Sequence, residues 1–307
     1  MKIIFSRKGF DLSSGFLPSP IFEDNTYFSL PIPYKDKYGI PFADVSYKCN
    51  EGKSMNLMEL LNQLGNFKPI NEGRRSVIDT DLCHFDPDIA DNVTIQGRYE
   101  PWQRGFGQKN GEQTHLEGQG VKKGDLFIFF GRFQDVIEKN GKYRYKEKSP
   151  ERHVIFGWMQ VGEILEINPN PNENNKNDKS EYPLLKNHPH YNWDNDLNNV
   201  IYIPTEELSL NPEKKGYGIF EQYDDKFLLS KNGENMGIWK LPTCFHKDNG
   251  ISLSKHGKDS RWGKIEEGED FFNLESVRRG QEFVLNYDNA RDETKKEIET
   301  WVKNLFA

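Results

Sequence analysis

One short segment of the sequence gathers side chains that could transfer a proton or bind a ligand. Residues 79–88 contain four aspartates and one histidine. His84 and Asp86 stand two positions apart, so in an extended chain both side chains point to the same face. An imidazole beside a carboxylate suits general acid–base catalysis, and we therefore expect His84 or Asp86 to transfer a proton. The alternative is a turn in which the aspartates cap backbone amides around Pro87.

The same pair also fits a metal site. A His-x-Asp pair together with a distant histidine is the ligand pattern of non-haem iron oxygenases. Spacing alone does not select the third ligand among the candidates His153, His188, His190, His246 and His256. The segment 188–190 looks like a metal pair, but its central proline favours a surface turn. We therefore assign no metal ligand and keep an iron- and 2-oxoglutarate-dependent oxygenase as an alternative.

Glutamines and glycines are concentrated between residues 103 and 120. The stretch contains Gln108, Gln113 and Gln119 together with His115. Side-chain amides donate and accept hydrogen bonds in one plane, which suits a planar ligand such as the edge of a nucleobase. We predict that the three glutamines bind substrate and that His115 is a further candidate for proton transfer.

The turn after the first apolar run places two cations beside a carboxylate. Arg7 and Lys8 precede Gly9, and Asp11 follows shortly after. Glycine turns at strand ends expose backbone N–H groups, and Arg or Lys adds charge-assisted bonds to a phosphate or carboxylate. We expect Arg7 and Lys8 to hold an anionic group, with Asp11 supporting proton transfer. A solvated turn is the alternative.

Two further candidates lie in an apolar segment that runs from 153 to 167. Trp158 and Gln160 share one face of the expected strand, so they could offer a stacking surface and an amide to a base. Base–aromatic stacking is worth about 1–3 kcal/mol per base. The alternative is that Trp158 belongs to the core.

The elements that must position these residues are mixed, with strands dominant. Continuous apolar runs predict strands at 2–6, 126–130, 153–167, 200–203 and 226–229, and Gly157 and Gly162 predict bulges or close approach of the backbone. A helix is predicted from Ser54 as N-cap to Gly65. We expect one α+β domain over 1–307, with a strongly curved β-rich core at about 120–245 and flanking helices. A flexible polar loop is expected at 168–181, and a C-terminal helix at about 291–306.

Composition excludes several classes of protein. The 307 residues carry 41 basic and 48 acidic side chains, a net charge of -7, which argues against a broadly basic nucleic-acid surface. No apolar stretch approaches the length of a membrane span. The three cysteines are far apart and form no disulfide framework, so we expect a cytoplasmic protein. P-loop, Rossmann and serine-hydrolase motifs are missing from the sequence.

Several segments together resemble one known family, the third type of nucleotide modification associated domain, found in bacteria and phages. The most characteristic are Ser6-Arg7-Lys8-Gly9-Phe10-Asp11, Cys83-His84-Phe85-Asp86-Pro87-Asp88, and the stretches at 18–21, 106–121, 124–131, 156–163 and 239–242. The resemblance implies an α+β protein acting in modification of DNA bases or nucleotides, and it adds Ser19 to the substrate-binding candidates. At the level of fold, residues 124–165 also resemble the barrel core of PUA-like and EVE-type readers of modified bases.

Together these features predict a nucleotide- or base-modifying protein of a bacterial or phage DNA-modification or conflict system. Its expected ligand is a nucleotide or a DNA base, and other DNA-modification proteins are candidate partners. No cofactor is assigned. A non-catalytic reader of modified bases remains the principal alternative, because the same side chains could bind a base without changing it.

Overall fold

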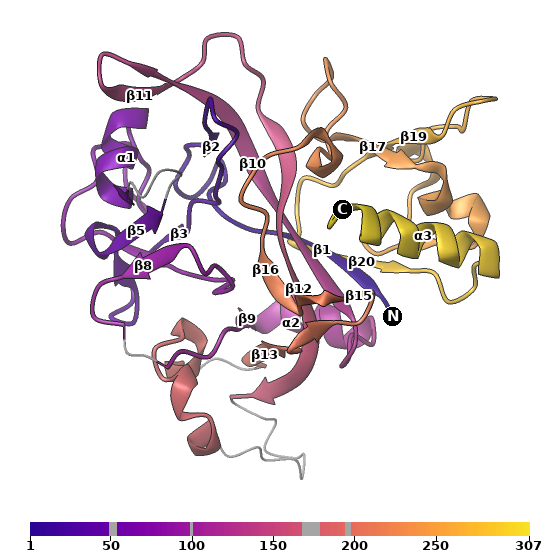
Figure 1. Cartoon of the computed structure of the whole chain (residues 1–307), viewed down its shortest axis with the longest axis horizontal. Coiled ribbons are helices and arrows are strands. Elements are labelled where there is room, and N and C mark those ends of the chain that lie inside the picture. The colour runs from indigo at the N-terminus through magenta and orange to yellow at the C-terminus, as the bar shows by residue number, and fades with distance from the viewer. Residues whose placement is uncertain (49–53, 99–100, 168–178, 194–197) are drawn as a thin grey trace.

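A ten-stranded mixed sheet crosses the molecule in the computed structural model, which describes residues 1–48, 54–98, 101–167, 179–193 and 198–307 (Figure 1). Its main path runs through β18 (Ser252–Leu253), β20 (Glu282–Asn286), β1 (Ile3–Arg7), β10 (Leu126–Lys139), β12 (Arg152–Glu166), β13 (Val200–Pro204) and β9 (Phe106–Gln108). Three strands pair outside this path: β2 (Ser19–Ile21) and β11 (Lys142–Tyr145) with β10, and β16 (Tyr217–Ile219) with β12. Pairing is parallel where β1 and β2 meet β10 and antiparallel elsewhere in this sheet.

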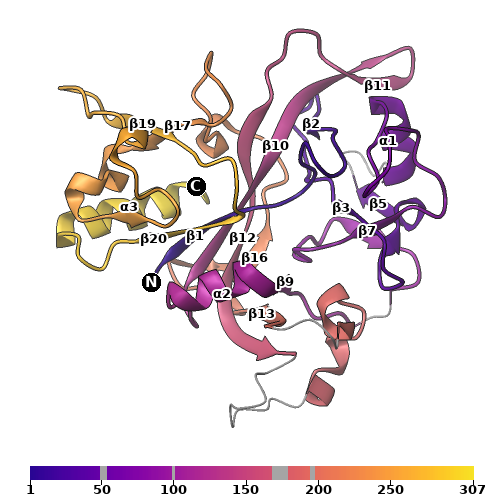
Figure 2. The same cartoon turned by 180° about the vertical axis from the view of Figure 1, so that it is seen from behind.

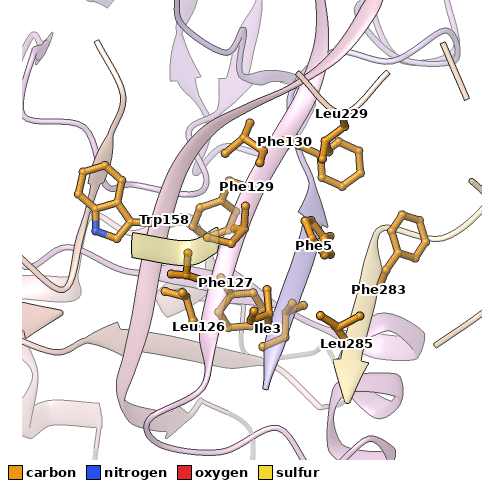
Figure 3. Packing of buried hydrophobic residues seen from close by; sticks show 14 of the residues in the cluster. Ile3, Phe5, Leu126, Phe127, Phe129, Phe130, Trp158, Leu229, Phe283 and Leu285 are labelled. Carbon is orange, nitrogen blue, oxygen red and sulfur yellow. The ribbon is translucent and has the colours of Figure 1, made fainter. Parts of the chain in front are cut away.

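The apolar runs of the sequence form the centre of this sheet. β1 lies between β10 and β20, and the side chains of Ile3, Ile4 and Phe5 are fully buried. A strand buried on both faces reads as a continuous apolar run, as these residues do. Figure 3 shows Phe5 on β1, Phe283 on the neighbouring β20, and Phe127 and Phe129 along β10. The N-terminal strand is therefore a core element.

Bulges interrupt the pairings of β12 with β10 and with β13, beside or at the predicted glycines. The register between β10 and β12 shifts where Phe129 pairs with Gly157 but Phe130 pairs with Ile155. A second shift skips Gly162 where β12 pairs with β13. An added residue bends and twists a strand locally, so both predictions of a bulge are confirmed.

The chain between β1 and β9 builds a lobe on one face of the β10–β12 ribbon, and the C-terminal elements lie on the other (Figures 1 and 2). The lobe contains β3 (Ile32–Tyr34), β4 (Ile40–Pro41), β5 (Val45–Lys48), β6 (Ser54–Asn56), α1 (Leu57–Leu64), β7 (Leu82–His84) and β8 (Val93–Ile95). α2 (Asn110–Gly118) follows β9. The other side holds two small two-stranded sheets, β14 (Glu207–Leu208) with β15 (Asn211–Lys215) and β17 (Ile238–Pro242) with β19 (Phe271–Glu275), and the helix α3 (Asp292–Asn304).

Most of the predicted architecture is confirmed. The fold is α+β with strands dominant, and α3 is the expected C-terminal helix. Over the described ranges the main sheet is open, with β18 and β9 at its two ends, so it does not close into a PUA-like barrel. β20 pairs with β1, and residues near both ends of the chain contribute to one core, while the expected single domain stays a prediction.

Three local predictions need comment. The side chain of Asn56, not Ser54, caps α1 by accepting from the Glu59 amide. The predicted strand at 226–229 is wrong, because Asp225–Phe227 form a 3₁₀ helix whose first turn is capped by Asp224. Of the expected flexible loop at 168–181, residues 168–178 lie outside the described residues. The remainder, Lys179–Glu181, is a 3₁₀ helix.

Candidate functional site

Two histidines and an aspartate converge between the N-terminal lobe and the main sheet. His84 is the last residue of β7, and Asp86 follows two positions later. His190 lies in the 3₁₀ helix Pro189–Asn192, far along the chain. One potential ligand atom from each of the three side chains lies within 4.8 Å of the other two. These three residues are called the central cluster below.

Neighbouring strands and rings fix the positions of the two imidazoles. β7 pairs with β3 through His84 and Ile32, which anchors the end of the strand. The His84 ring stacks on Tyr34 with centroids 5.2 Å apart, and Trp193 packs against both His84 and His190. Packing on several sides restricts the rotamers of these rings, so the cluster is pre-organised by its aromatic surroundings.

Asp86 accepts a hydrogen bond at one oxygen and faces an imidazole at the other. The backbone N–H of Gly107, in β9, donates to Oδ1 over 2.8 Å. The Nε2 atom of His188 lies 3.5 Å from the same oxygen, and Nε2 of His190 lies 3.7 Å from Oδ2. The carboxylate therefore has one oxygen tied to the frame and one directed into the cluster.

Hydrogen bonds at the opposite ring nitrogens distinguish His188 from His190. The amide nitrogen of Asn199 donates to the backbone oxygens of His190 and Trp193, so its Oδ1 accepts the proton of His190 Nδ1 over 2.7 Å. This leaves a lone pair on Nε2 of neutral His190. In His188 the roles reverse, because Nδ1 accepts from the His190 backbone N–H. Neutral His188 therefore carries its proton on Nε2, facing Asp86.

Burial and neighbouring charges set the protonation of the cluster. Burial lowers the pKa of His84 to about 4 and lowers the pKa of His190 well below its ordinary value, because a buried imidazolium loses its hydration. For Asp86 burial acts to raise the pKa. The nearby imidazoles of His188, His190 and His84 outweigh burial and hold the pKa of Asp86 below its usual range. At neutral pH the cluster thus combines a carboxylate with neutral imidazoles.

A second set of buried polar side chains meets at β9. Lys8 Nζ lies 2.7 Å from Glu282 Oε1, and the side-chain amide of Gln108 donates to the same oxygen over 2.8 Å. The other carboxylate oxygen of Glu282 is buried and has no hydrogen-bond partner. Since Gly107 in the same strand donates to Asp86, β9 connects this set to the central cluster.

One cavity borders the central cluster, and a second lies beside the neighbouring strand β4. One, of about 40 Å³, is lined by Asp86 and by aromatic and aliphatic side chains that include Tyr27, Phe28 and Phe156. This volume holds a few water molecules and is too small for a nucleobase. The other, of about 250 Å³, is lined among others by Tyr38, Gln96, Arg98, Trp102, Asn187 and Asn192. It is called the Arg98–Trp102 pocket.

The Arg98–Trp102 pocket combines stacking and hydrogen-bonding groups close to the cluster. The guanidinium of Arg98 lies 3.8 Å from the Trp102 ring centroid and pairs with Asp88 over 2.6 Å. Nε1 of Trp102 is buried without a hydrogen-bond partner. Ile40, which also lines the pocket, pairs with Cys83 directly before His84. The β4 wall of the pocket therefore lies beside β7, the strand that ends at His84.

A family model described as nucleotide modification associated domain 3 matches residues 2–286. The chain belongs to this family. Membership confirms the resemblance found in the sequence and connects the chain with nucleotide modification, and the matched range includes the whole central cluster. No curated protein and no solved structure matches the chain. Among the described residues, no helix is both long and apolar enough to cross a membrane.

Four of the residues predicted for the site of this family member come together. His84 and Asp86 form two thirds of the central cluster. Lys8 and Gln108, the last residue of β9, meet at Glu282, the first residue of β20. All four side chains are largely buried. Burial of a polar group costs free energy unless the group is paired, so such groups are usually paired or functional.

The N-terminal candidates other than Lys8 serve the backbone. Arg7 donates to the carbonyls of Val277, Arg278 and Gly280 and so ties the loop before β20 to β1. The Asp11 carboxylate accepts from Ser13 and Ser14 and caps an exposed turn. The Ser19 hydroxyl accepts from the Leu30 amide. Their geometry favours structural roles.

The other glutamines and His115 are also engaged elsewhere. Gln113 hydrogen bonds with Tyr202 and Glu117, and Gln119 is exposed at the end of α2. Nε2 of His115 lies 3.0 Å from the hydroxyl of Ser254. None of these three belongs to the central cluster.

Trp158 and Gln160 are part of the interior of the sheet. Trp158 packs against Phe220 and Phe306, and its Nε1 donates to the Lys215 carbonyl. The Gln160 side chain bonds to Gly124 and Ser209. Trp158 is 8% exposed and its ring is packed against two other aromatic rings, so this arrangement does not favour the expected use of either residue.

The sequence-based prediction did not select several residues of the site, although His188 and His190 were among the candidate third ligands. His188 and His190 are at most 2% exposed, so the expectation of a surface turn is wrong. The only signal in the sequence is a pair of histidines around a proline. In the structure the first of them, His188, caps the 3₁₀ helix by accepting the His190 backbone N–H at Nδ1. Gly107 contributes its backbone N–H to Asp86, and Asn199 contributes its side-chain oxygen to the His190 ring. The residue type of neither one indicates this role in the sequence.

Proposed function

We propose that the protein is a nucleotide- or base-modifying enzyme of a bacterial or phage DNA-modification or conflict system, with the central cluster as its active centre. The observation that supports this most is the convergence of His84, Asp86 and His190 in the interior. Buried ionisable groups are costly unless paired or used, and their clustering marks functional sites. Family membership supplies the connection with nucleotides.

The Arg98–Trp102 pocket is the proposed place for the nucleotide. Tyr38 and Trp102 line the pocket with aromatic rings, one face of Trp102 being stacked on Arg98, and the amides of Gln96, Asn187 and Asn192 can read the edge of a base. At about 250 Å³ the pocket has room for a base, while the smaller cavity at Asp86 does not.

The charges favour a small ligand over duplex DNA. The net charge of -7 opposes binding to a polyanion, and Arg7 is tied to backbone carbonyls while Lys8 is paired with Glu282. A free nucleotide, or a base delivered by a partner protein, suits such a site. Tight, salt-dependent binding of duplex DNA in a mobility-shift titration would contradict this preference.

Ligand binding is tested by a thermal-shift screen against nucleotides and modified nucleosides. A ligand at a hundred times its dissociation constant stabilises the folded state by about 2.7 kcal/mol, which is readily detected. The substitution Trp102→Leu should abolish the shift for any ligand that stabilises the wild type. Gln119→Ala, at an exposed amide outside the pocket, is the matched control and should leave it intact.

Turnover is tested with the ligands that bind. Asp86→Asn preserves the shape of the carboxylate and its contact with Gly107 but removes its charge, so product formation should stop while ligand binding persists. Asp11→Asn, which changes an exposed turn, is the control. If the wild type binds its ligand and yields no product on long incubation, the protein is a reader of modified bases and the enzymatic proposal fails.

A further inference from the structure

We propose that His84, Asp86 and His190 bind one divalent transition-metal ion. The inference deepens the proposed function, because any role of the ion in turnover rests on that function. Metal binding itself requires no nucleotide. Two imidazoles and one carboxylate form a common ligand set for such ions in enzymes, and the three ligand atoms already lie within 4.8 Å of one another.

The spacing needs only a small adjustment to enclose an ion. Imidazole nitrogens and carboxylate oxygens bind zinc at about 2.0–2.2 Å, so two ligand atoms of one ion lie about 3 Å apart in the usual geometries. Nε2 of His190 and Oδ2 of Asp86 are 3.7 Å apart. Movements of about 1 Å by these side chains therefore complete the site.

The hydrogen bond to Asn199 prepares His190 as a ligand. Metal-binding histidines typically donate the second ring N–H to a carbonyl or carboxylate oxygen, which fixes the tautomer and orients the ring. Nδ1 of His190 donates to Oδ1 of Asn199 over 2.7 Å, and Asn199 is itself held by two backbone carbonyls. The remaining nitrogen, Nε2, presents its lone pair toward Asp86.

His188 is a positioning residue and not a fourth ligand. Its Nδ1 accepts the backbone N–H of His190, so in the neutral ring Nε2 carries the proton and has no lone pair for a metal. That proton faces Oδ1 of Asp86, 3.5 Å away. Together with the Gly107 amide it orients the carboxylate so that Oδ2 is left for the ion.

A purely structural role for the central cluster explains its atoms without hydrogen-bond partners less well than a bound metal ion does. A lone pair of His190 Nε2 and a carboxylate oxygen of Asp86 face each other, an arrangement that is repulsive until a cation lies between them. Nε2 of His84 is also buried, with His84 7% exposed and no hydrogen bond at that nitrogen. A metal ion satisfies all three atoms at once.

The ligand set selects the class of ion. Imidazole nitrogens suit zinc, iron, copper and nickel, whereas magnesium and calcium prefer oxygen ligands only. Three protein ligands leave coordination positions for water or substrate, as in catalytic sites and unlike closed structural zinc sites. We therefore expect the site to bind an ion such as Zn²⁺ or Fe²⁺ and not to bind Mg²⁺ tightly.

The inference is tested by direct metal binding to the full chain without a histidine tag. Protein stripped by dialysis against a chelator is titrated anaerobically with Co²⁺, Zn²⁺ or Fe²⁺, with Mg²⁺ as the contrasting ion. We expect one Co²⁺ per chain, visible as a ligand-field spectrum. Asp86→Asn and His190→Gln should each weaken binding at least a hundredfold, and His188→Gln about tenfold, while His115→Gln binds as the wild type does.

Pulsed electron paramagnetic resonance of the wild type with bound Cu²⁺ gives a test that needs no variant to fold. Two coordinated imidazoles support the site, and one or none overturns it. Absence of stoichiometric binding, or unchanged affinity in folded Asp86→Asn and His190→Gln, also overturns it. Because no nucleotide is present in either measurement, these outcomes leave the proposed function undecided, and a metal-loaded protein without turnover counts against that function alone.

Discussion

The α-carbon of Gly107 lies against the imidazole of His190 so closely that a β-carbon there would come within 2.1 Å of the ring. The backbone N–H of the same residue donates to Oδ1 of Asp86. One glycine in β9 therefore touches two members of the central cluster. It does so through close approach of the backbone, a role that only a residue without a side chain can fill.

Gly107→Ala should consequently displace His190 and disrupt the cluster. The clash involves ring atoms held by Trp193 and Asn199, so the ring cannot move aside freely. We expect destabilisation of about 1–3 kcal/mol, typical of overpacking, and loss of metal binding. Urea unfolding and a Co²⁺ titration measure the two effects.

Gly111→Ala is the matched control for this substitution. Gly111 lies in α2, and a β-carbon there would meet no atom within 4 Å. Alanine should leave metal affinity unchanged and stabilise the helix slightly. Equal metal affinity in Gly107→Ala and Gly111→Ala would show that the contact with His190 is unimportant.

Asn199 should matter for metal affinity through its oxygen. Asn199→Ala removes the acceptor of His190 Nδ1 and two bonds to backbone carbonyls, so both metal affinity, by about 10–100-fold, and stability should fall. Asn199→Asp loses the same donors but keeps an oxygen near His190. Its affinity should therefore exceed that of the alanine variant at comparable stability. Equal affinities in the two variants would refute the tautomer argument.

The parts of the fold that follow from local pattern could be predicted from the sequence. Continuous apolar runs give β1, β10 and β12, glycines in the runs give the bulges, and the amphipathic C-terminal segment gives α3. A sheet closes into a barrel only when its two edge strands, here β18 and β9, pair with each other. The sequence of a single segment does not contain that information. The 3₁₀ helix at 225–227 reflects a side-chain cap that competes with an apolar strand pattern.

The candidate site was predictable only where its chemistry is contiguous. His84 and Asp86 stand close together in the sequence and remain together in the structure. Arg7 and Lys8 look equivalent as cations, yet neighbouring residues of an extended chain point to opposite sides. Arg7 reaches the 277–280 loop, and Lys8 reaches the buried Glu282. The burial of His190 depends on long-range packing with Trp193 and β9, which spacing cannot reveal.

The pairing of Lys8 with Glu282 predicts strong coupling between the two residues. Both side chains are at most 9% exposed, and the carboxylate also accepts from Gln108. Removing one partner of a buried ion pair leaves an uncompensated charge and typically costs about 3–5 kcal/mol. Lys8→Met should therefore destabilise the protein by that amount, and Lys8→Met with Glu282→Leu should cost less than Lys8→Met alone. A double-mutant cycle of urea unfolding that shows additive effects would contradict the pairing.

His153 in β12 predicts a loss of stability in mild acid. Its Nδ1 accepts from Nε1 of Trp239 over 2.9 Å, and its ring packs on Phe130. Burial, together with the nearby cations Arg7 and Arg132, lowers the pKa of His153 to about 3. In the unfolded chain the pKa of histidine is about 6.5, so between these two values the unfolded state binds the additional proton.

Stability from His153 is therefore fully present above about pH 6.5 and is lost as the pH falls toward the folded-state pKa. Between pH 7.5 and pH 5 the loss from this one residue is about 2 kcal/mol. His153→Gln cannot be protonated, so its free energy of unfolding should fall by that much less over the same interval, although it starts lower at pH 7.5. Urea unfolding of both proteins at the two pH values measures this difference, and equal losses in the two proteins would show that His153 is not held neutral by burial.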